Sequence, residues 1–163
     1  MATGLSRKLT GQIGEYLVAA ELGRRGIIAT PFAGNVPDID IVAYANNMTI
    51  PIQVKAKRKK GYAWQFSATK FLEIEIEDDF QKIIGRNTSL DRDLLCVFLR
   101  LGDSLGEEAF FILPQGWLQD FFMRNYKGGH RTKNPKSYHC AIWEKHMQEH
   151  IDRWDLIKSA LGF

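Results

Sequence analysis

The chain has 163 residues, of which 45% are hydrophobic and 25% are charged. This length and composition exclude a disordered chain and predict one globular domain over residues 1–163. The net charge of +3 is too small to indicate a partner, so the distribution of charge has to be considered. No apolar run is long enough to cross a bilayer, and Cys96 and Cys140 lie in apolar surroundings. We therefore expect a cytoplasmic protein with reduced thiols and no membrane contact.

The N-terminal third is predicted to contain a helix followed by three strands. The helix is apolar almost all the way round, so we expect other elements to cover most of its sides. A glycine ends it, and an Asn-Asn pair between two later strands predicts a hairpin. The predicted elements are a helix over 6–25 with Gly26 after it, and strands over 27–32, 39–44 and 49–56, with the turn at Asn46 and Asn47.

The rest of the chain alternates between strand and helix patterns. Residues 73–84 begin with a period of two and continue with a helical pattern, and we expect a helix from about Glu77. A helix followed by a hairpin, further strands and further helices is typical of an α/β sandwich. The other predicted elements are strands over 62–67, 94–101 and 109–113, helices over 115–124 and 144–161, and a basic loop over 126–137.

Polar residues on the predicted hairpin have the chemistry needed for phosphodiester hydrolysis. Alternation along the strand puts Asp38 and Asp40 on one face, and in the next strand Gln53 and Lys55 share a face. The hairpin brings these faces together. Mg²⁺ prefers oxygen ligands, which Asp40, the Gln53 amide and the Val54 carbonyl supply, and an ammonium group orients water. The alternative is an ordinary polar face of a hairpin.

Two basic segments suggest a polyanionic partner, although each segment alone is also compatible with a solvated face. The second segment contains Tyr126, which we consider a candidate for stacking on bases. The candidate phosphate-binding residues are Lys57, Arg58, Lys59 and Lys60 in the first segment, and Arg124, Lys127, Arg131, Lys133 and Lys136 in the second.

Three short motifs occur in an order that resembles a known nuclease family. They are Gly14-Glu15 in the first helix, P-D-I-D-I-V-A over Pro37 to Ala43, and I-Q-V-K over Ile52 to Lys55. This order resembles the PD-(D/E)XK superfamily of restriction enzymes and Holliday-junction resolvases, and especially the Mrr-type branch with glutamine at the second acidic position. The resemblance implies a restriction-endonuclease-like sandwich, in which a mixed β-sheet carries an N-terminal helix and flanking helices.

The resemblance also implies a role for each matching residue. Asp40 is the implied metal-binding aspartate, with Asp38 as the rival. Gln53 takes the second ligand position, Lys55 that of the catalytic lysine, and Glu15 that of the helix glutamate near the metal. Glu15 also has apolar helical neighbours, so its carboxylate is expected to be partly covered and to need a partner.

The implied function is that of a DNA endonuclease of restriction or resolvase type. It would use Mg²⁺, with Mn²⁺ as a substitute, and would act as a homodimer to cut two strands. The glutamine at position 53 leaves an alternative, a nuclease-like domain without catalysis that binds nucleic acid or protein. Nothing in the sequence separates DNA from RNA as the substrate.

Overall fold

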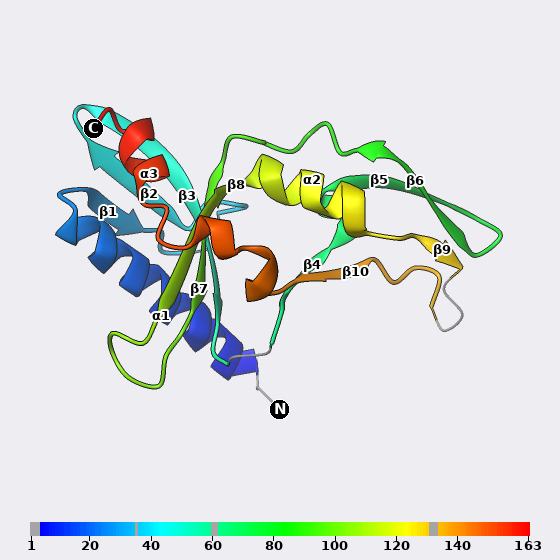
Figure 1. The fold of residues 1–163 in the computed structure, drawn as a ribbon, viewed down its shortest axis with the longest axis horizontal. Helices are drawn as coiled ribbons and strands as arrows, with labels where there is room; N and C mark the ends of the chain where they lie inside the picture. The colour runs from blue at the N-terminus through cyan, green and yellow to red at the C-terminus, as the bar shows by residue number, and fades with distance from the viewer. Residues whose placement is uncertain (1–3, 35, 60–61, 131–133) are drawn as a thin grey trace. The chain divides into compact units, whose positions relative to one another are not determined.

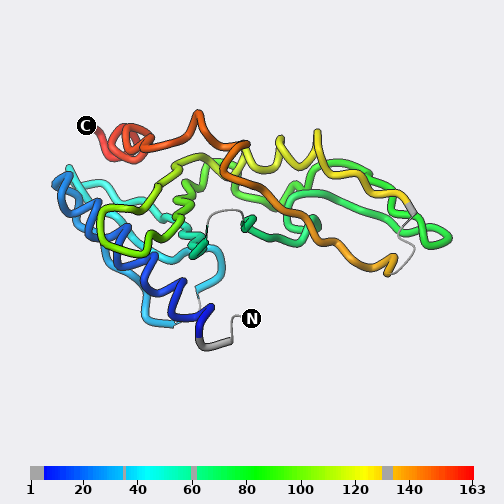
Figure 2. Tube along the Cα trace, turned by 60° about the horizontal axis from the view of Figure 1, so that its bottom comes forward, coloured from blue at the N-terminus to red at the C-terminus, as the bar shows by residue number. Residues whose placement is uncertain are grey.

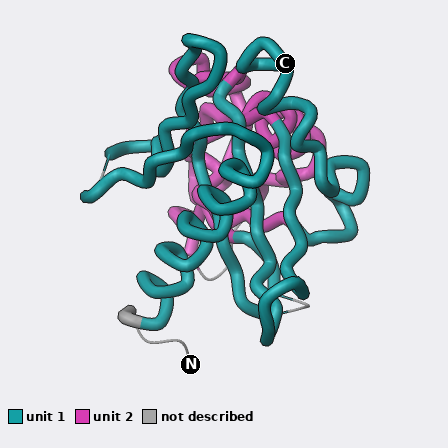
Figure 3. The backbone as a smooth tube through the Cα atoms, turned by 90° about the vertical axis from the view of Figure 1, so that its left-hand side faces the viewer, with its two compact units in different colours: residues 1–64, 94–113, 143–163 teal, residues 65–93, 114–142 magenta. Residues whose placement is uncertain are grey.

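The fold is described from a computed structural model that covers residues 4–34, 36–59, 62–130 and 134–163 (Figure 1). The chain divides into two compact units (Figure 3). The first contains residues 1–64, 94–113 and 143–163, and the second contains residues 65–93 and 114–142. Both ends of the chain, which Figure 2 traces from the N-terminal helix to the C-terminal helix, belong to the first unit. No helix among the described residues is both long and apolar enough to span a membrane.

A five-stranded mixed sheet forms the centre of the first unit. Neighbouring strands are antiparallel from β1 to β3, whereas β3 and β7 run parallel. The predicted hairpin is confirmed, and Asn46 and Asn47 make its turn with φ of 50° and 60°, the conformation of a two-residue type I′ turn. The strand order is β1 (Ile28–Pro31), β2 (Ile41–Ala45), β3 (Met48–Lys57), β7 (Leu95–Arg100) and β8 (Ala109–Pro114).

Helix α1 (Gly4–Arg24) packs against β3, and its close approach depends on one glycine. A Cβ atom on Gly14 would lie 2.6 Å from the Cβ of Ala56, so a larger residue does not fit there. A glycine inside a helix costs roughly 1 kcal/mol relative to alanine, which the close contact explains at Gly14. At Gly11 no heavy atom lies within 4 Å of such a Cβ, and packing gives no reason for a glycine there.

The expectation that other elements cover most of α1 is wrong. Only one side of the helix is buried, where Val18 and Leu22 enter the core. The opposite side leaves three apolar side chains in solvent, because no described element of the first unit packs over it. These are Leu9, Ile13 and Tyr16, with exposed fractions of 43%, 37% and 58%.

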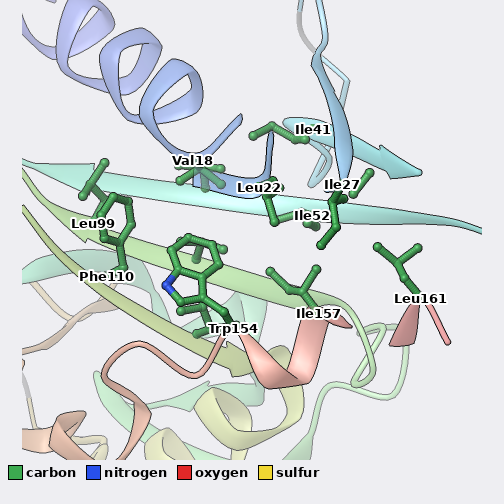
Figure 4. Packing of buried hydrophobic residues seen from close by; sticks show 14 of the residues in the cluster. Val18, Leu22, Ile27, Ile41, Ile52, Leu99, Phe110, Trp154, Ile157 and Leu161 are labelled. Atoms are coloured by element: carbon green, nitrogen blue, oxygen red, sulfur yellow. The ribbon is translucent and has the colours of Figure 1, made fainter. Parts of the chain in front are cut away.

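The core of the first unit lies between the sheet, α1 and the C-terminal segment (Figure 4). The C-terminal segment contributes Trp154, Ile157 and Leu161, the second of which belongs to α3 (Asp155–Ala160). The Trp154 ring packs against Phe110 of β8 at a centroid distance of 5.2 Å. Apolar side chains from both ends of the chain therefore stabilise the sheet that carries the predicted site.

The prediction of one long helix over residues 144–161 is wrong. Two 3₁₀ turns, η2 (Glu144–His146) and η3 (Gln148–His150), precede the short α3. Between them and α3 the chain pairs with β8, since Asp152 donates its backbone N–H to the Phe110 carbonyl at 2.9 Å and has a φ of 51°. Strand pairing therefore replaces helical hydrogen bonds. Without the long helix, Trp143 and Ile151 do not form a packing face, and their exposed fractions are 41% and 46%.

In the second unit the expected helix from Glu77 is instead a β-hairpin. Asp78 and Asp79 have φ of 49° and 62°, and they connect two antiparallel strands. The period-two pattern therefore extends past the turn. The predicted helix over 115–124 is confirmed. The elements are β4 (Trp64–Ser67), η1 (Ala68–Lys70), β5 (Leu72–Glu77), β6 (Phe80–Arg86), α2 (Gln115–Asn125), β9 (Gly129–His130) and β10 (His139–Ile142), of which β4 begins in the first unit.

Candidate functional site

Asp40 lies immediately before β2 and is held by both neighbouring segments. Its N–H donates to the Ile52 carbonyl at 3.0 Å, and its C=O accepts from Phe32 at 2.9 Å. Its carboxylate Oδ2 accepts the backbone N–H of Val54 at 2.7 Å. Three hydrogen bonds therefore fix the backbone and the side chain of Asp40 at the open end of β2, beside β3.

Asp38 is not on the strand, so the prediction that alternation places both aspartates on one strand face is wrong. Asp38 has a φ of 61° in the turn that begins at Pro37, and β2 starts only at Ile41. The turn nevertheless directs Asp38 toward β3, where its Oδ1 accepts a hydrogen bond from Nε2 of Gln53 at 3.2 Å. Both aspartates thus contact β3 from the segment before β2.

Gln53 is 4% exposed, and its amide connects the turn to the interior. While Nε2 donates to Asp38, Oε1 lies 3.9 Å from the thiol of Cys96 on the adjacent strand β7. Cys96 and Gln53 are register partners in the parallel pair. The Gln53 oxygen therefore accepts from a buried thiol in this structure, and the charge on Asp38 fixes the orientation of the amide.

Glu15 of α1 approaches Asp40 from the helix side of the sheet. Partial burial raises the pKa of the Glu15 carboxyl above its ordinary value, and repulsion from the Asp40 carboxylate raises that pKa further. A carboxyl that resists ionisation beside a second carboxylate makes a local environment that favours a cation. The structure therefore places Glu15 within electrostatic reach of Asp40, and joins Asp38 to Gln53 by a hydrogen bond.

Lys55 follows Gln53 on the same face of β3 and is half-buried. Its ammonium makes no ion pair or hydrogen bond with any side chain in the described parts of the chain. Its backbone is held, because the Trp64 indole donates to the Lys55 carbonyl at 2.9 Å while the ring packs against Phe98. A lysine with a fixed backbone and an uncommitted ammonium has the properties needed to interact with a bound anion.

Lys57 is different from the other residues of the first basic segment because it is buried, at 8% exposure. Its Nζ lies 2.7 Å from Oε1 of Glu144 and 2.6 Å from the Tyr62 carbonyl. It also lies 4.4 Å from the centre of the Trp64 ring. The expected phosphate contact is not available to this ammonium, which instead ties the end of β3 to η2.

The donors at the site fit a hard divalent cation that keeps part of its water. Along β3 the N–H and C=O of one residue point to the same edge, so the Val54 carbonyl faces the edge where its N–H bonds Asp40. No three His, Cys, Asp or Glu side chains of the described residues gather as a metal-binding group. Two carboxylates and a carbonyl match Mg²⁺, which binds through one or two carboxylates together with water and substrate phosphates.

The remaining basic candidates are exposed wherever the structure describes them. Arg58 and Lys59 follow Lys57 at the surface of the first unit. Tyr126 is buried, and its hydroxyl donates to Gln81 at 2.7 Å, so its proposed role in stacking on bases is wrong. Arg124, Lys127 and Lys136 are exposed on the second unit, whereas Lys60, Arg131 and Lys133 lie outside the described residues.

Sequence reasoning missed three residues that contact Gln53, Lys55 or Lys57. Cys96 was expected only to be a reduced thiol in apolar surroundings, and Trp64 was assigned no role at the site. Glu144 was placed in a helix, although it is the partner of Lys57 across 87 positions. Only one sequence signal was available: Lys57 continues the alternation of Gln53 and Lys55, so a longer strand would have placed it on the same covered face.

No family model and no curated protein matches the chain. Among solved structures it is similar to a bacterial homing endonuclease, I-Ssp6803I, with a TM-score of 0.55 and 17% identity over 96% of this chain and 97% of that chain. It is also similar to Hjc of Archaeoglobus fulgidus, a Holliday junction resolvase from an archaeal hyperthermophile, with a TM-score of 0.45 and 18% identity over 85% and 93% of the two chains. Only the first likeness is close enough to support an argument, and it concerns the fold. The predicted α/β fold with a mixed sheet is therefore confirmed, and the chain shares it with a homing endonuclease.

Proposed function

We propose that this chain is a metal-dependent endonuclease that hydrolyses phosphodiester bonds of DNA. The observation that supports this most strongly is the position of the Asp40 carboxylate, which accepts the Val54 N–H at 2.7 Å beside β3 and lies close enough to Glu15 of α1 to raise the pKa of that carboxyl. This arrangement occurs in a chain with the fold of a homing endonuclease. A bound divalent cation would relieve the repulsion between the carboxylates.

Asp40, Glu15 and the Val54 carbonyl would hold the cation. Mg²⁺, or Mn²⁺ in its place, would offset charge on the phosphate and make bound water more acidic. Asp40 is suited to ligation because Val54 already fixes one carboxylate oxygen at 2.7 Å, which limits the orientations of the other. Glu15 is suited because it ionises reluctantly without a cation beside it.

Lys55 would supply the positive charge next to the scissile phosphate. Its ammonium has no partner among the described residues, so no ion pair has to break before it contacts an anion. At that position an ammonium orients a water molecule or holds a proton in transit, and it stabilises charge that develops on the phosphate oxygens. The Trp64 hydrogen bond at 2.9 Å keeps the strand, and hence the lysine, in place.

Exposed cations on both units would hold other phosphates of the substrate. Arg58 and Lys59 extend from the end of β3 in the first unit, and Arg124, Lys127 and Lys136 are exposed on the second. Phosphate contacts of this kind provide affinity without sequence specificity. Cleavage of both strands of a duplex would require two copies of the site, and we propose a homodimer for that reason.

A second candidate function is nucleic-acid binding without cleavage, and the state of Gln53 favours it. The residue at the second ligand position has a neutral amide whose oxygen accepts from Cys96 and whose nitrogen donates to Asp38. Ligation by Gln53 would require its oxygen to leave the buried thiol. A site with one weak ligand would bind its cation poorly, and such a domain would retain the phosphate contacts alone.

One cleavage assay separates the two functions. The wild-type protein is incubated with linear, branched and single-stranded DNA in Mg²⁺, in Mn²⁺ and in chelator, and binding to the same DNA is measured in parallel. The endonuclease proposal predicts cleavage of at least one DNA form that requires the metal. Binding of DNA without cleavage under any of these conditions would contradict the proposal and support the binding module.

A further inference from the structure

The side of α1 that carries Glu15 continues for two helical turns toward the N-terminus. Residues spaced by three, four and seven positions share one side of a helix, so Lys8, Gly11 and Glu15 lie along one edge of α1. Seven residues at 1.5 Å each place Lys8 about 10 Å from Glu15 along the helix axis. This edge therefore connects the candidate site with the basic beginning of the helix.

Exposed cations gather where this edge ends. Nε of Arg58, just past the end of β3, donates to Oγ1 of Thr10 in α1 at 2.7 Å. That bond holds the Arg58 guanidinium against α1 one turn from Arg7, and both Arg7 and Lys8 are exposed. None of these three basic side chains makes an ion pair with an acidic residue in the described part of the chain. Their charge is available to an external anion.

Gly11 leaves the middle of the same edge open. A Cβ at this position would meet no heavy atom within 4 Å, and the φ of Gly11 is not positive. Neither packing nor backbone conformation therefore requires the glycine, in contrast to Gly14, where Ala56 blocks a side chain. Glycine is also the residue that permits close approach of a ligand to the backbone. The unexplained glycine lies midway between Lys8 and Glu15.

We infer that one strand of a DNA duplex runs along this edge of α1, from Glu15 past Gly11 to Lys8, with Arg7 next to Lys8 at the beginning of the helix and Arg58 one turn from Arg7. Phosphates of one strand follow one another about every 3.4 Å along the duplex axis, so the edge spans about three nucleotides. The cations hold phosphates beside the one that reaches Asp40, and Gly11 gives room to the sugar-phosphate backbone. This inference rests on the proposed function, because it places the substrate relative to the candidate site.

The salt dependence of DNA binding tests the role of the cations. Binding to a duplex is measured in chelator, where cleavage does not interfere, for the wild type and for a variant with Arg7→Gln and Lys8→Gln. Each lost phosphate contact lowers the slope of log Kobs against log salt by about 0.9, so the double variant is expected to lose up to about two units of slope. The matched control carries Lys145→Gln and Lys158→Gln, which remove the same charge elsewhere on the first unit, and it should keep the wild-type slope.

A pair of substitutions tests the open position at Gly11. Gly11→Ala and Gly11→Gln both fit the free space and both favour the helix, so each should raise the midpoint of thermal unfolding. Gly11→Gln should in addition weaken DNA binding by tenfold or so, because its side chain fills the path of the backbone, while Gly11→Ala should bind more nearly as the wild type does.

The outcomes separate this inference from the proposed function. An unchanged slope in the Arg7 and Lys8 variant, or equal slope losses in the variant and its control, overturns the inference even if the wild type cleaves DNA. Absence of duplex binding by the wild type overturns it as well. A lower slope in the variant alone, together with weaker binding by Gly11→Gln, supports the inference even if no DNA is ever cleaved, in which case only the endonuclease proposal fails.

Discussion

Replacing Glu15 by glutamine is expected to stabilise the metal-free protein near neutral pH. Burial and the nearby Asp40 raise the pKa of the Glu15 carboxyl above its ordinary value of 4.5. The folded state therefore binds more protons than the unfolded state between 4.5 and that higher pKa. The contribution of the protonated Glu15 carboxyl to the free energy of unfolding is fully present below about pH 4.5 and is lost as the pH rises through the folded-state pKa. Glutamine has no charge to lose, so Glu15→Gln removes this decline.

The size of the gain is limited because the carboxylate remains partly in contact with water. For a partly exposed carboxylate, solvent screening limits such a gain to at most about 1 kcal/mol. In a chain of this size, that difference raises the unfolding midpoint by about 2–4 °C. Thermal unfolding followed by circular dichroism in chelator at pH 7 and at pH 4 measures both the gain and its disappearance in acid.

Added Mg²⁺ should make the wild type more stable than the Glu15→Gln variant, which reverses the order expected without metal. A cation that binds only the folded state raises its stability with concentration, and the wild type keeps the carboxylate that Glu15→Gln lacks. The control is Glu21→Gln on the same helix. Because Glu21 pairs with Arg25 at 2.6 Å, this variant should be slightly less stable than the wild type. Two results would refute the assignment of Glu15 as a carboxylate held beside Asp40 for a metal. One is a gain in stability of Glu15→Gln that persists at pH 4, and the other is equal stabilisation of both proteins by Mg²⁺.

Four further substitutions test the other residues of the site and the buried ion pair of Lys57. Asp40→Asn should remove Mn²⁺ binding in a calorimetric titration, whereas Asp38→Asn should retain most of it, and the reverse order would make Asp38 the principal ligand. Gln53→Glu adds an anionic oxygen beside Asp38 and should tighten metal binding while lowering metal-free stability; weaker metal binding in this variant would argue against Gln53 as the second ligand position. Glu144→Gln leaves the buried Lys57 without its ionic partner and should cost about 3 kcal/mol in denaturant unfolding, whereas a loss below about 0.5 kcal/mol would mean that the Tyr62 carbonyl and the Trp64 ring suffice.

The parts of the fold that the sequence predicted correctly have strong local causes. Gly26 ends the first helix with a φ of 76°, and the Asn46-Asn47 turn determines the register of β2 against β3. The positions of Gln53 and Lys55 follow from that register, because strand alternation has a period of two. These local rules also place Asp40 at the edge of β2, next to the strand that bears the lysine.

The parts that the sequence did not predict depend on contacts between distant residues. Lys57 and Lys59 look equivalent in a basic run, yet Glu144 and Trp64 bury the former. Asp38 appeared to belong to the strand, but its positive φ in the turn overrides the alternation. The helical pattern after Glu144 fails because β8 offers backbone hydrogen bonds to Asp152. For Lys57 and Asp152 a partner far away in sequence decides which local pattern prevails, whereas for Asp38 the turn itself does so.

Single-turnover cleavage by the wild type and by Lys55→Ala, in saturating Mn²⁺ and at equal DNA occupancy, tests the proposed endonuclease most directly. The account predicts that the wild type cleaves only with metal and that Lys55→Ala lowers the rate constant by about two to four orders of magnitude. The variant should keep the fold and most of the DNA affinity, because the lost interaction stabilises the transition state more than the bound substrate. Equal rates for the two proteins, or no metal-dependent cleavage by the wild type, would contradict the account.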